Sequence, residues 1–170
     1  MKWNPHLTFN GQCAAAFHFY QQCLGGEIVT MLTYAESPLA THTPPAMHDK
    51  ILHATLALGD LMLTGADAAP ESYQPPQGVS VLLHTDSPEE ADRIFAALTE
   101  GGAIEMPIQQ TFWAARFGML VDQFGIPWMI NCSAPSDAMP NEETATVMAK
   151  PKIRASSLTR GAGPRPAAAS

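Results

Sequence analysis

The sequence contains one internal repeat, whose two copies are offset by 76 residues. The residues that match at this spacing are Leu7 with Leu83, Ala15 with Ala91, Phe19 with Phe95, Gly25 and Gly26 with Gly101 and Gly102, and Ile28 with Ile104. Each copy has the pattern of a strand, a helix that ends at Gly-Gly, and three further strands. A unit of about 60 residues buries too little apolar surface to be secure alone. We therefore expect an α+β fold in which two tandem βαβββ modules form one curved mixed sheet, with a concave cleft and the helices outside.

The predicted elements follow the same order in both copies. In the first, the pattern predicts an extended segment over 3–10, a helix over 11–24, and strands over 27–34, 50–58 and 61–64. In the second, it predicts a strand over 79–84, a helix over 86–100, and strands over 103–110, 116–121 and 127–132. Two Pro-rich loops cover 36–49 and 66–77. We place module one at about residues 3–65 and module two at about 78–132, within one domain over 1–132.

Residues 133–170 differ from the rest of the chain in composition. They contain no Phe, Trp or Tyr and are rich in Pro, Ala, Ser and Thr. Such a segment buries too little apolar surface to offset the entropy that it loses on ordering. We predict a mostly disordered tail outside the fold, with at most a short helix near residues 142–150.

The charge of the chain is unevenly divided between these two parts. The formal net charge is −7, but residues 1–132 carry 13 acidic and 4 basic side chains, which gives −9. An acidic body excludes nucleic acids and anionic membranes as partners, because both are bound by basic surfaces. No run of about 18 apolar residues is present, and the first residues lack the apolar stretch of a signal peptide. Since the cysteines (Cys13, Cys23 and Cys132) form no CxxC pair, we expect a cytoplasmic protein with reduced, buried thiols.

Two separated segments carry a resemblance to a known family. The first is NPHLTFNG over residues 4–11 with AFHFY over 16–20, and the second is QQTFWAARFG over 109–118 with DQFGIPWMIN over 122–131. Over about residues 3–132 the chain resembles the PhnB-like branch of the vicinal oxygen chelate superfamily, which includes glyoxalase I, extradiol dioxygenases, fosfomycin-resistance proteins and bleomycin-binding proteins. Ala114 and Gln123 stand where the family usually has Gly and Pro, so we expect altered loop geometry there and retained function.

The resemblance implies that, in metal-using relatives, the ligands come from the first and last strands of each module. A catalytic divalent ion needs three or more suitable donors. Here His6 is the one donor near an expected place, residues 61–64 and 79–81 supply none, and Met129 stands where a Glu is expected. We therefore expect no metal and no other cofactor. A Gly-rich strand-to-helix loop for a methyl donor is also missing, so we reject the ubiquinone-pathway methyltransferase label sometimes given to this branch.

The candidates for a ligand-binding cleft are His6, Phe9, His53, Trp113, Arg116 and Trp128. Two interpretations of His53 stay open: it lines the cleft, as a matching His does in PhnB-like relatives, or it is a hydrogen-bonded structural histidine. The aromatic residues are either core side chains or the walls of an apolar pocket. Arg116 either binds an anionic ligand or pairs with Asp122 or Glu105.

Three functional hypotheses follow from these patterns. The leading one is a PhnB-like protein that binds a small organic molecule in the cleft without a catalytic metal, and no catalytic residue is assigned. The second is a divalent-metal-dependent enzyme of the glyoxalase or dioxygenase class that uses His6, His53 and a loop donor such as His48 or Asp49. The third is an interaction module whose acidic body binds a basic partner. The resemblance also implies a homodimer, which exposed edge strands favour.

Overall fold

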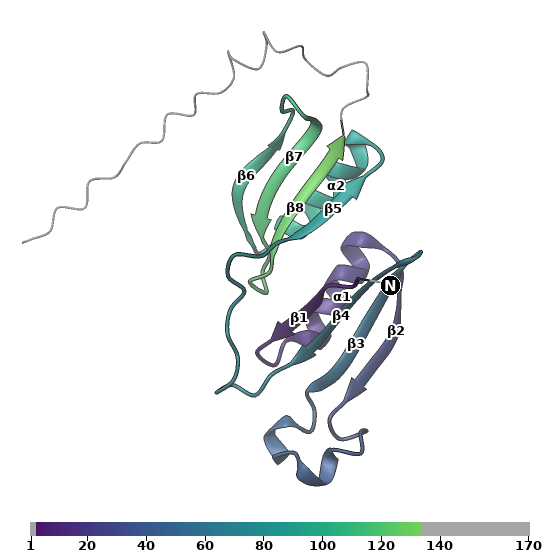
Figure 1. Cartoon of the computed structure of the whole chain (residues 1–170), viewed down its shortest axis with the longest axis vertical. Coiled ribbons are helices and arrows are strands. Elements are labelled where there is room, and N and C mark those ends of the chain that lie inside the picture. Colours follow the sequence, from purple (N-terminus) through teal and green to yellow (C-terminus); the bar gives the residue numbers. More distant parts are fainter. Residues whose placement is uncertain (1–2, 134–170) are drawn as a thin grey trace, which may run out of the picture. The chain divides into compact units, whose positions relative to one another are not determined.

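The computed structural model describes residues 3–133, so the predicted disorder of the tail and its short helix lie outside the described residues. The first module contains β1 (His6–Phe9), α1 (Cys13–Leu24), β2 (Glu27–Thr33), two 3-10 turns (Ala40–His42 and Pro45–Met47), β3 (Ile51–Leu58) and β4 (Leu61–Asp67). The second contains β5 (Val81–Thr85), α2 (Pro88–Thr99), β6 (Ala103–Gln109), β7 (Ala114–Val121) and β8 (Pro127–Ser133) (Figure 1). Neither helix of this part of the chain has the length and apolar character needed to cross a membrane.

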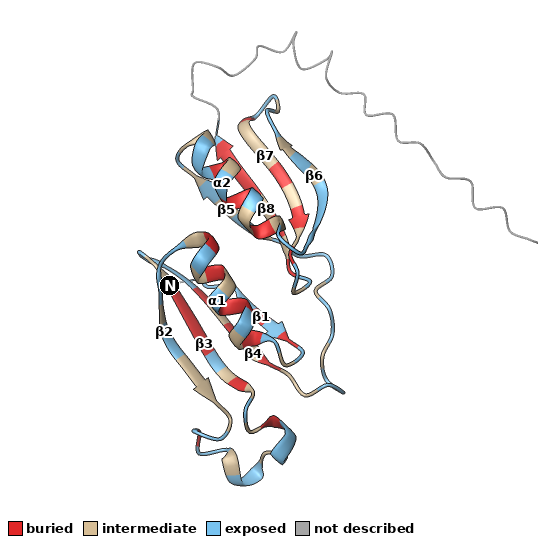
Figure 2. Ribbon diagram, turned by 180° about the vertical axis from the view of Figure 1, so that it is seen from behind, coloured by how far each residue is buried: buried red, intermediate tan, exposed pale blue. Residues whose placement is uncertain are grey.

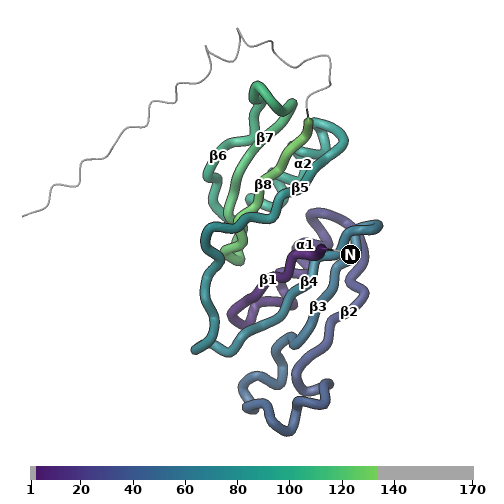
Figure 3. The backbone as a smooth tube through the Cα atoms, in the orientation of Figure 1, coloured from purple at the N-terminus to yellow at the C-terminus, as the bar shows by residue number. Residues whose placement is uncertain are grey.

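Both modules have the same sheet topology, which can be followed in Figure 3. The strand order is β1-β4-β3-β2 in the first and β5-β8-β7-β6 in the second. In each module the first strand runs parallel to the last, and the other neighbours are antiparallel. The predicted tandem βαβββ repeat is confirmed. The expected single sheet, however, is divided into two four-stranded sheets, because no ladder within residues 3–133 joins the edge strands β1 and β5.

Each helix packs on one face of its own sheet (Figure 2). The buried helical residues are Cys13, Ala16, Phe17, Tyr20 and Cys23 on α1, and Ala91, Ile94, Phe95 and Leu98 on α2. Spacings of three and four residues place each set on one side of its helix. On β3, Ala54 and Leu56 are fully buried toward α1, so the alternate residue His53 points the other way. We call the face of each sheet that points away from its helix the open face.

Side chains of α1 connect the two modules. The Tyr20 hydroxyl donates a 2.7 Å hydrogen bond to the carboxylate of Asp122, which directly follows β7. The Tyr20 and Trp128 rings meet edge to face, with centroids 5.3 Å apart. The Arg93 guanidinium of α2 donates to the Cys23 carbonyl oxygen at 2.9 Å. The modules are therefore joined by side chains of the helices and not by strand pairing.

Candidate functional site

Four polar side chains form a row across the open face of the first sheet. We call them the histidine–threonine row: His6 on β1, Thr64 on β4, and Thr55 and His53 on β3. The register pairs His6 with Thr64 and Thr64 with Thr55. His53 lies two residues before Thr55 and so shares its face. The strand order thus brings together two histidines that are 47 residues apart in the sequence.

Hydrogen bonds fix the orientation of the His6 ring. Its Nδ1 lies 3.0 Å from Thr64 Oγ1, and the Thr64 hydroxyl donates to the Pro5 carbonyl oxygen at 3.0 Å. Because a hydroxyl has one hydrogen, Nδ1 of His6 is the donor to Thr64. In the neutral imidazole the lone pair then lies on Nε2, for which no hydrogen-bond partner is found among residues 3–133. This nitrogen is able to accept a hydrogen bond or a proton from a ligand.

His53 lies beside His6 on the open face. The two ring centroids are 6.5 Å apart with planes at 12°, and His53 Nε2 is 3.1 Å from Thr55 Oγ1. The pKa of His6 is lowered from its ordinary value, first by partial burial and then by the positive charge of a protonated His53. His6 is therefore a neutral imidazole at neutral pH.

The aromatic candidates lie elsewhere. Phe9 and Trp128 are each 1% exposed and belong to the hydrophobic core. Trp113 directly precedes β7 and is exposed, and its ring packs against Phe117 with centroids 5.5 Å apart. The structure therefore joins His6 with His53 and leaves these three side chains apart from the row.

Arg116 lies on the side of the second sheet that faces α2. Its Nε donates to the Asp92 carboxylate of α2 at 3.0 Å, and its Nη1 donates to the Ala115 carbonyl oxygen at 2.9 Å. The partner is neither of the two acids that the sequence suggested. Glu105 is exposed on β6, and Asp122 is bound to Tyr20 and other donors. The Arg116 guanidinium thus attaches α2 to β7.

The open face of the second sheet is largely apolar. The register aligns Met106, Met119 and Met129 on β6, β7 and β8. One polar pair interrupts it, since His84 Nδ1 and Asn131 Nδ2 lie 3.1 Å apart.

Two of these polar residues, Thr64 and Asn131, carry no signal in the sequence that would place them at a site. The sequence does carry a signal for Thr55, because this residue lies two positions after His53 on the same predicted strand and so shares its face.

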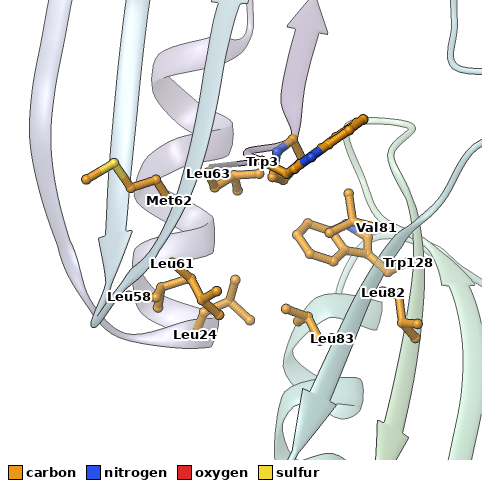
Figure 4. Close-up of a pocket in the computed structure, with 11 residues that line it drawn as sticks. Trp3, Leu24, Leu58, Leu61, Met62, Leu63, Val81, Leu82, Leu83 and Trp128 are labelled. Atoms are coloured by element: carbon orange, nitrogen blue, oxygen red, sulfur yellow. The ribbon is translucent and has the colours of Figure 1, made fainter. Parts of the chain in front are cut away.

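Two pockets lie near these faces. One, of about 250 Å³, is beside His6 and is also lined by Pro76, Val79 and Pro127. The other, of about 140 Å³, is lined only by apolar residue types (Figure 4). Figure 4 shows Leu61 and Leu82 among its lining side chains. The first pocket gives a ligand space next to His6.

A catalytic divalent ion requires a defined ligand set, with which the described residues can be compared. Between Trp3 and Ser133, no three His, Cys, Asp or Glu side chains are grouped as ligands would be. The histidine–threonine row offers two imidazoles and two neutral hydroxyls, whereas such an ion needs three or more strong donors. Burial raises the pKa of Cys13 to about 12 and that of Cys23 to about 11. Both thiols are therefore protonated at neutral pH, and a protonated thiol is a poor nucleophile.

Comparisons with known proteins agree on one family. The family model that matches residues 1–131 is described as 3-demethylubiquinone-9 3-methyltransferase. Protein YjdN of Escherichia coli (strain K12) is 35% identical over 139 residues, which cover 77% of this chain and 95% of YjdN. The crystal structure of protein PA1353 from Pseudomonas aeruginosa is 45% identical with a TM-score of 0.73, covering 78% of this chain and 98% of that one. The PhnB protein from Bacillus cereus is 26% identical with a TM-score of 0.66, covering 78% and 100%.

At lower identity the likeness concerns the fold alone. A glyoxalase/bleomycin resistance/dioxygenase family enzyme from Burkholderia phytofirmans is 15% identical with a TM-score of 0.53, and the match covers 76% of this chain and 95% of that one. Its fold agrees with the tandem modules described above. The chain belongs to the PhnB-like family, whose model is described as 3-demethylubiquinone-9 3-methyltransferase, and its tandem modules have the fold of the vicinal oxygen chelate superfamily.

Proposed function

We propose that this protein binds a small organic molecule on the open face of the first sheet, without a resident catalytic metal. The observation that carries the proposal is the state of His6: Nδ1 is engaged with Thr64, which leaves Nε2 as an acceptor beside a pocket of about 250 Å³. A hydroxyl or N–H group of the ligand would donate to Nε2, and the apolar side chains of Pro76 and Val79 would contact the rest of the molecule. Free cysteines favour a cytoplasmic location.

Methyl transfer, the activity in the family description, does not enter this proposal. The connection between β1 and α1 is Asn10-Gly11-Gln12, with a single glycine. The first amide of α1, that of Cys13, donates to the buried Asp67 carboxylate at 2.9 Å. This carboxylate occupies the helix end at which an anionic group of a cofactor would otherwise bind.

The absence of a resident metal is a testable part of the proposal. Protein purified without added metal is expected to show, in native mass spectrometry, no stoichiometric Zn, Ni, Mn or Fe. A co-purified organic ligand is expected to remain after EDTA treatment, because imidazole and hydroxyl groups hold it. His6→Ala should lower its occupancy about tenfold through the loss of one hydrogen bond. His42→Ala, in the exposed loop, should leave the occupancy unchanged. About one metal ion per chain would contradict the proposal.

The protonation of His6 gives a pH dependence. Because its pKa is lowered, Nε2 is expected to stay an acceptor down to a pH below that at which an ordinary histidine titrates, about 6.5. Ligand binding should be lost as the pH falls through the lowered value. Folded-state stability should decline from about pH 6.5 down to that value, because the unfolded chain binds this proton more tightly over that interval. NMR titration of the His6 ring measures the value, and His53→Gln should raise it. Titration of His6 at or above pH 6.5 would count against this account.

The alternative function is a divalent-metal-dependent enzyme of the glyoxalase or dioxygenase type. The loop residues that this enzyme would use as metal ligands, His48 and Asp49, already interact with neighbouring residues. His48 Nε2 donates to the Thr43 carbonyl oxygen at 3.0 Å, and Asp49 pairs with Lys50 at 3.2 Å. Activity that a chelator abolishes, a divalent ion restores and His53→Ala removes would favour this alternative over the metal-free proposal.

We also propose that two copies of the chain form a homodimer. The strands β1 and β5 lie at sheet edges, and the apolar pocket of Figure 4 is lined by the exposed side chains of Trp3, Leu61 and Leu82. A second copy would remove these apolar groups from water. The double variant Leu61→Glu/Leu82→Glu should convert the dimer to a monomer in light scattering. Val29→Glu, an exposed site on β2, should leave the dimer intact. A monomeric wild-type protein would contradict the proposal.

A further inference from the structure

The two Pro-rich loops of the first module meet around a cavity of about 510 Å³. It lies beyond the ends of β1 and β4, and its lining includes Asn10, Gly11, Pro44, Met47, Lys50 and Glu71. The volume falls in the range of small-molecule sites. No residue of the histidine–threonine row lines it. The cavity is therefore separate from the site proposed above.

Hydrogen bonds within the longer loop preform one wall of the cavity. The Thr43 hydroxyl donates to the Leu39 carbonyl oxygen at 2.8 Å, and the His48 ring donates to the Thr43 carbonyl oxygen at 3.0 Å. The Tyr34 hydroxyl donates to the Asp67 carbonyl oxygen at 3.2 Å, which attaches the loop to the end of β4. Because these bonds already order the loop, little entropy is lost when a ligand binds.

Lys50 supplies the positive charge in this cavity. Its side chain lies over Gly11, where a Cβ would be 3.4 Å from Lys50 Cε. The other cations of residues 3–133 have structural roles, since Arg93 donates to a backbone carbonyl and Arg116 pairs with a carboxylate of α2. The Lys50 ammonium pairs with its neighbour Asp49 at 3.2 Å, but the Asp49 side chain is 75% exposed. Such a surface pair is weak and is readily exchanged for another anion.

We propose that this cavity is a second ligand site and that it takes a small organic anion, whose carboxylate pairs with the Lys50 ammonium. The apolar part of the molecule would contact Pro44 and Met47. The net charge of the body opposes an anion, so the attraction comes from the local Lys50 ammonium, which lies beside a mostly apolar cavity where a charge pair is screened less than in water. Glu71 also lines the cavity and repels the same group, so the site favours a single negative charge placed on the Lys50 side.

The test uses benzoate, with uncharged benzamide as the matched probe, in NMR titrations of the full chain. Benzoate is expected to shift the amide resonances of Gly11 and Met47 with a Kd of about 1 mM. Lys50→Gln should weaken benzoate binding about tenfold and leave benzamide binding unchanged, while Lys50→Arg retains benzoate binding. Raising the salt from about 0.05 to about 0.5 M should weaken benzoate binding to the wild type and not to Lys50→Gln.

A second pair of variants separates this site from the histidine–threonine row. Glu71→Gln should tighten benzoate binding, because it removes the repelling carboxylate. His53→Ala should leave benzoate binding unchanged. Equal affinities for benzoate and benzamide, wild-type affinity in Lys50→Gln, or the absence of shifts at Gly11 and Met47 would overturn the proposal. Loss of benzoate binding in His53→Ala would place the anion at the row and would also overturn it, without contradicting a ligand on the open face.

Discussion

Replacing Asp122 with alanine is expected to lower the free energy of unfolding by about 4 kcal/mol. The Asp122 carboxylate is buried and accepts four hydrogen bonds. Oδ2 accepts from the Tyr20 hydroxyl at 2.7 Å and from Trp128 Nε1 at 2.8 Å. Oδ1 accepts from the backbone N–H groups of Phe124 at 2.8 Å and Ile126 at 3.0 Å. The variant would leave three buried donors and the half-buried Phe124 N–H without this acceptor, and each buried donor costs roughly 1–3 kcal/mol before the structure relaxes.

Two control variants separate the loss of the whole network from smaller effects. Burial and the charge of Asp122 raise the pKa of Tyr20, so its hydroxyl stays protonated and donates. Tyr20→Phe removes one of the four bonds and should cost about 1 kcal/mol. Glu105→Ala, on the exposed face of β6, should change stability by less than about 0.5 kcal/mol. Urea unfolding followed by circular dichroism gives the three values. If Asp122→Ala is as stable as Glu105→Ala, the network does not hold the modules together.

The repeat made the architecture of each module predictable, but not the way in which the modules join. The spacing of Cys13, Ala16, Phe17, Tyr20 and Leu24 predicts the buried face of α1; the first four are buried, and Leu24, the last residue of the helix, is half-buried. A repeat does not specify whether two sheets share a ladder. Here the joining interactions include the bond between Tyr20 and Asp122, 102 residues apart, and the packing of Tyr20 on Trp128. Neither pair has a spacing that a sequence pattern would reveal.

The candidate site was predictable only in part for a similar reason. The alternation of His53 with Ala54 correctly predicts that it points away from the helix. Its position beside His6 depends on the insertion of β4 between β1 and β3, which is a property of sheet order and register. The partner of Arg116 was missed because Asp92 lies on α2, and its approach to β7 is set by helix–sheet packing. Local patterns therefore predicted the direction of a side chain better than its partner.

The two Gly-Gly pairs do more than end α1 and α2. The Gly25 N–H donates to the Gln21 carbonyl oxygen at 2.9 Å, its φ is 81°, and a Cβ there would meet nothing within 4 Å. Gly26 has a φ of 84°, and a Cβ there would meet the backbone carbonyl oxygen of Ala57. Gly102 has no positive φ, but a Cβ there would meet the backbone carbonyl oxygen of Val121. In both modules, the second glycine allows the start of one strand to approach its antiparallel neighbour closely.

Alanine at these positions therefore separates two physical effects. Gly25→Ala imposes only a backbone conformation, φ 81° and ψ −159°, that is essentially restricted to glycine, and it should cost about 1–2 kcal/mol. Gly102→Ala imposes only the overlap between the new Cβ and the Val121 carbonyl oxygen. This overlap should cost about 2 kcal/mol, because a backbone carbonyl, unlike a flexible side chain, moves only with its strand. Gly26→Ala imposes both and should cost about 3 kcal/mol, the largest loss of the three. Urea unfolding of the three variants measures this order. If Gly26→Ala were no less stable than Gly25→Ala, the contact with Ala57 would not require glycine, and the second residue of each pair would serve only to end the helix.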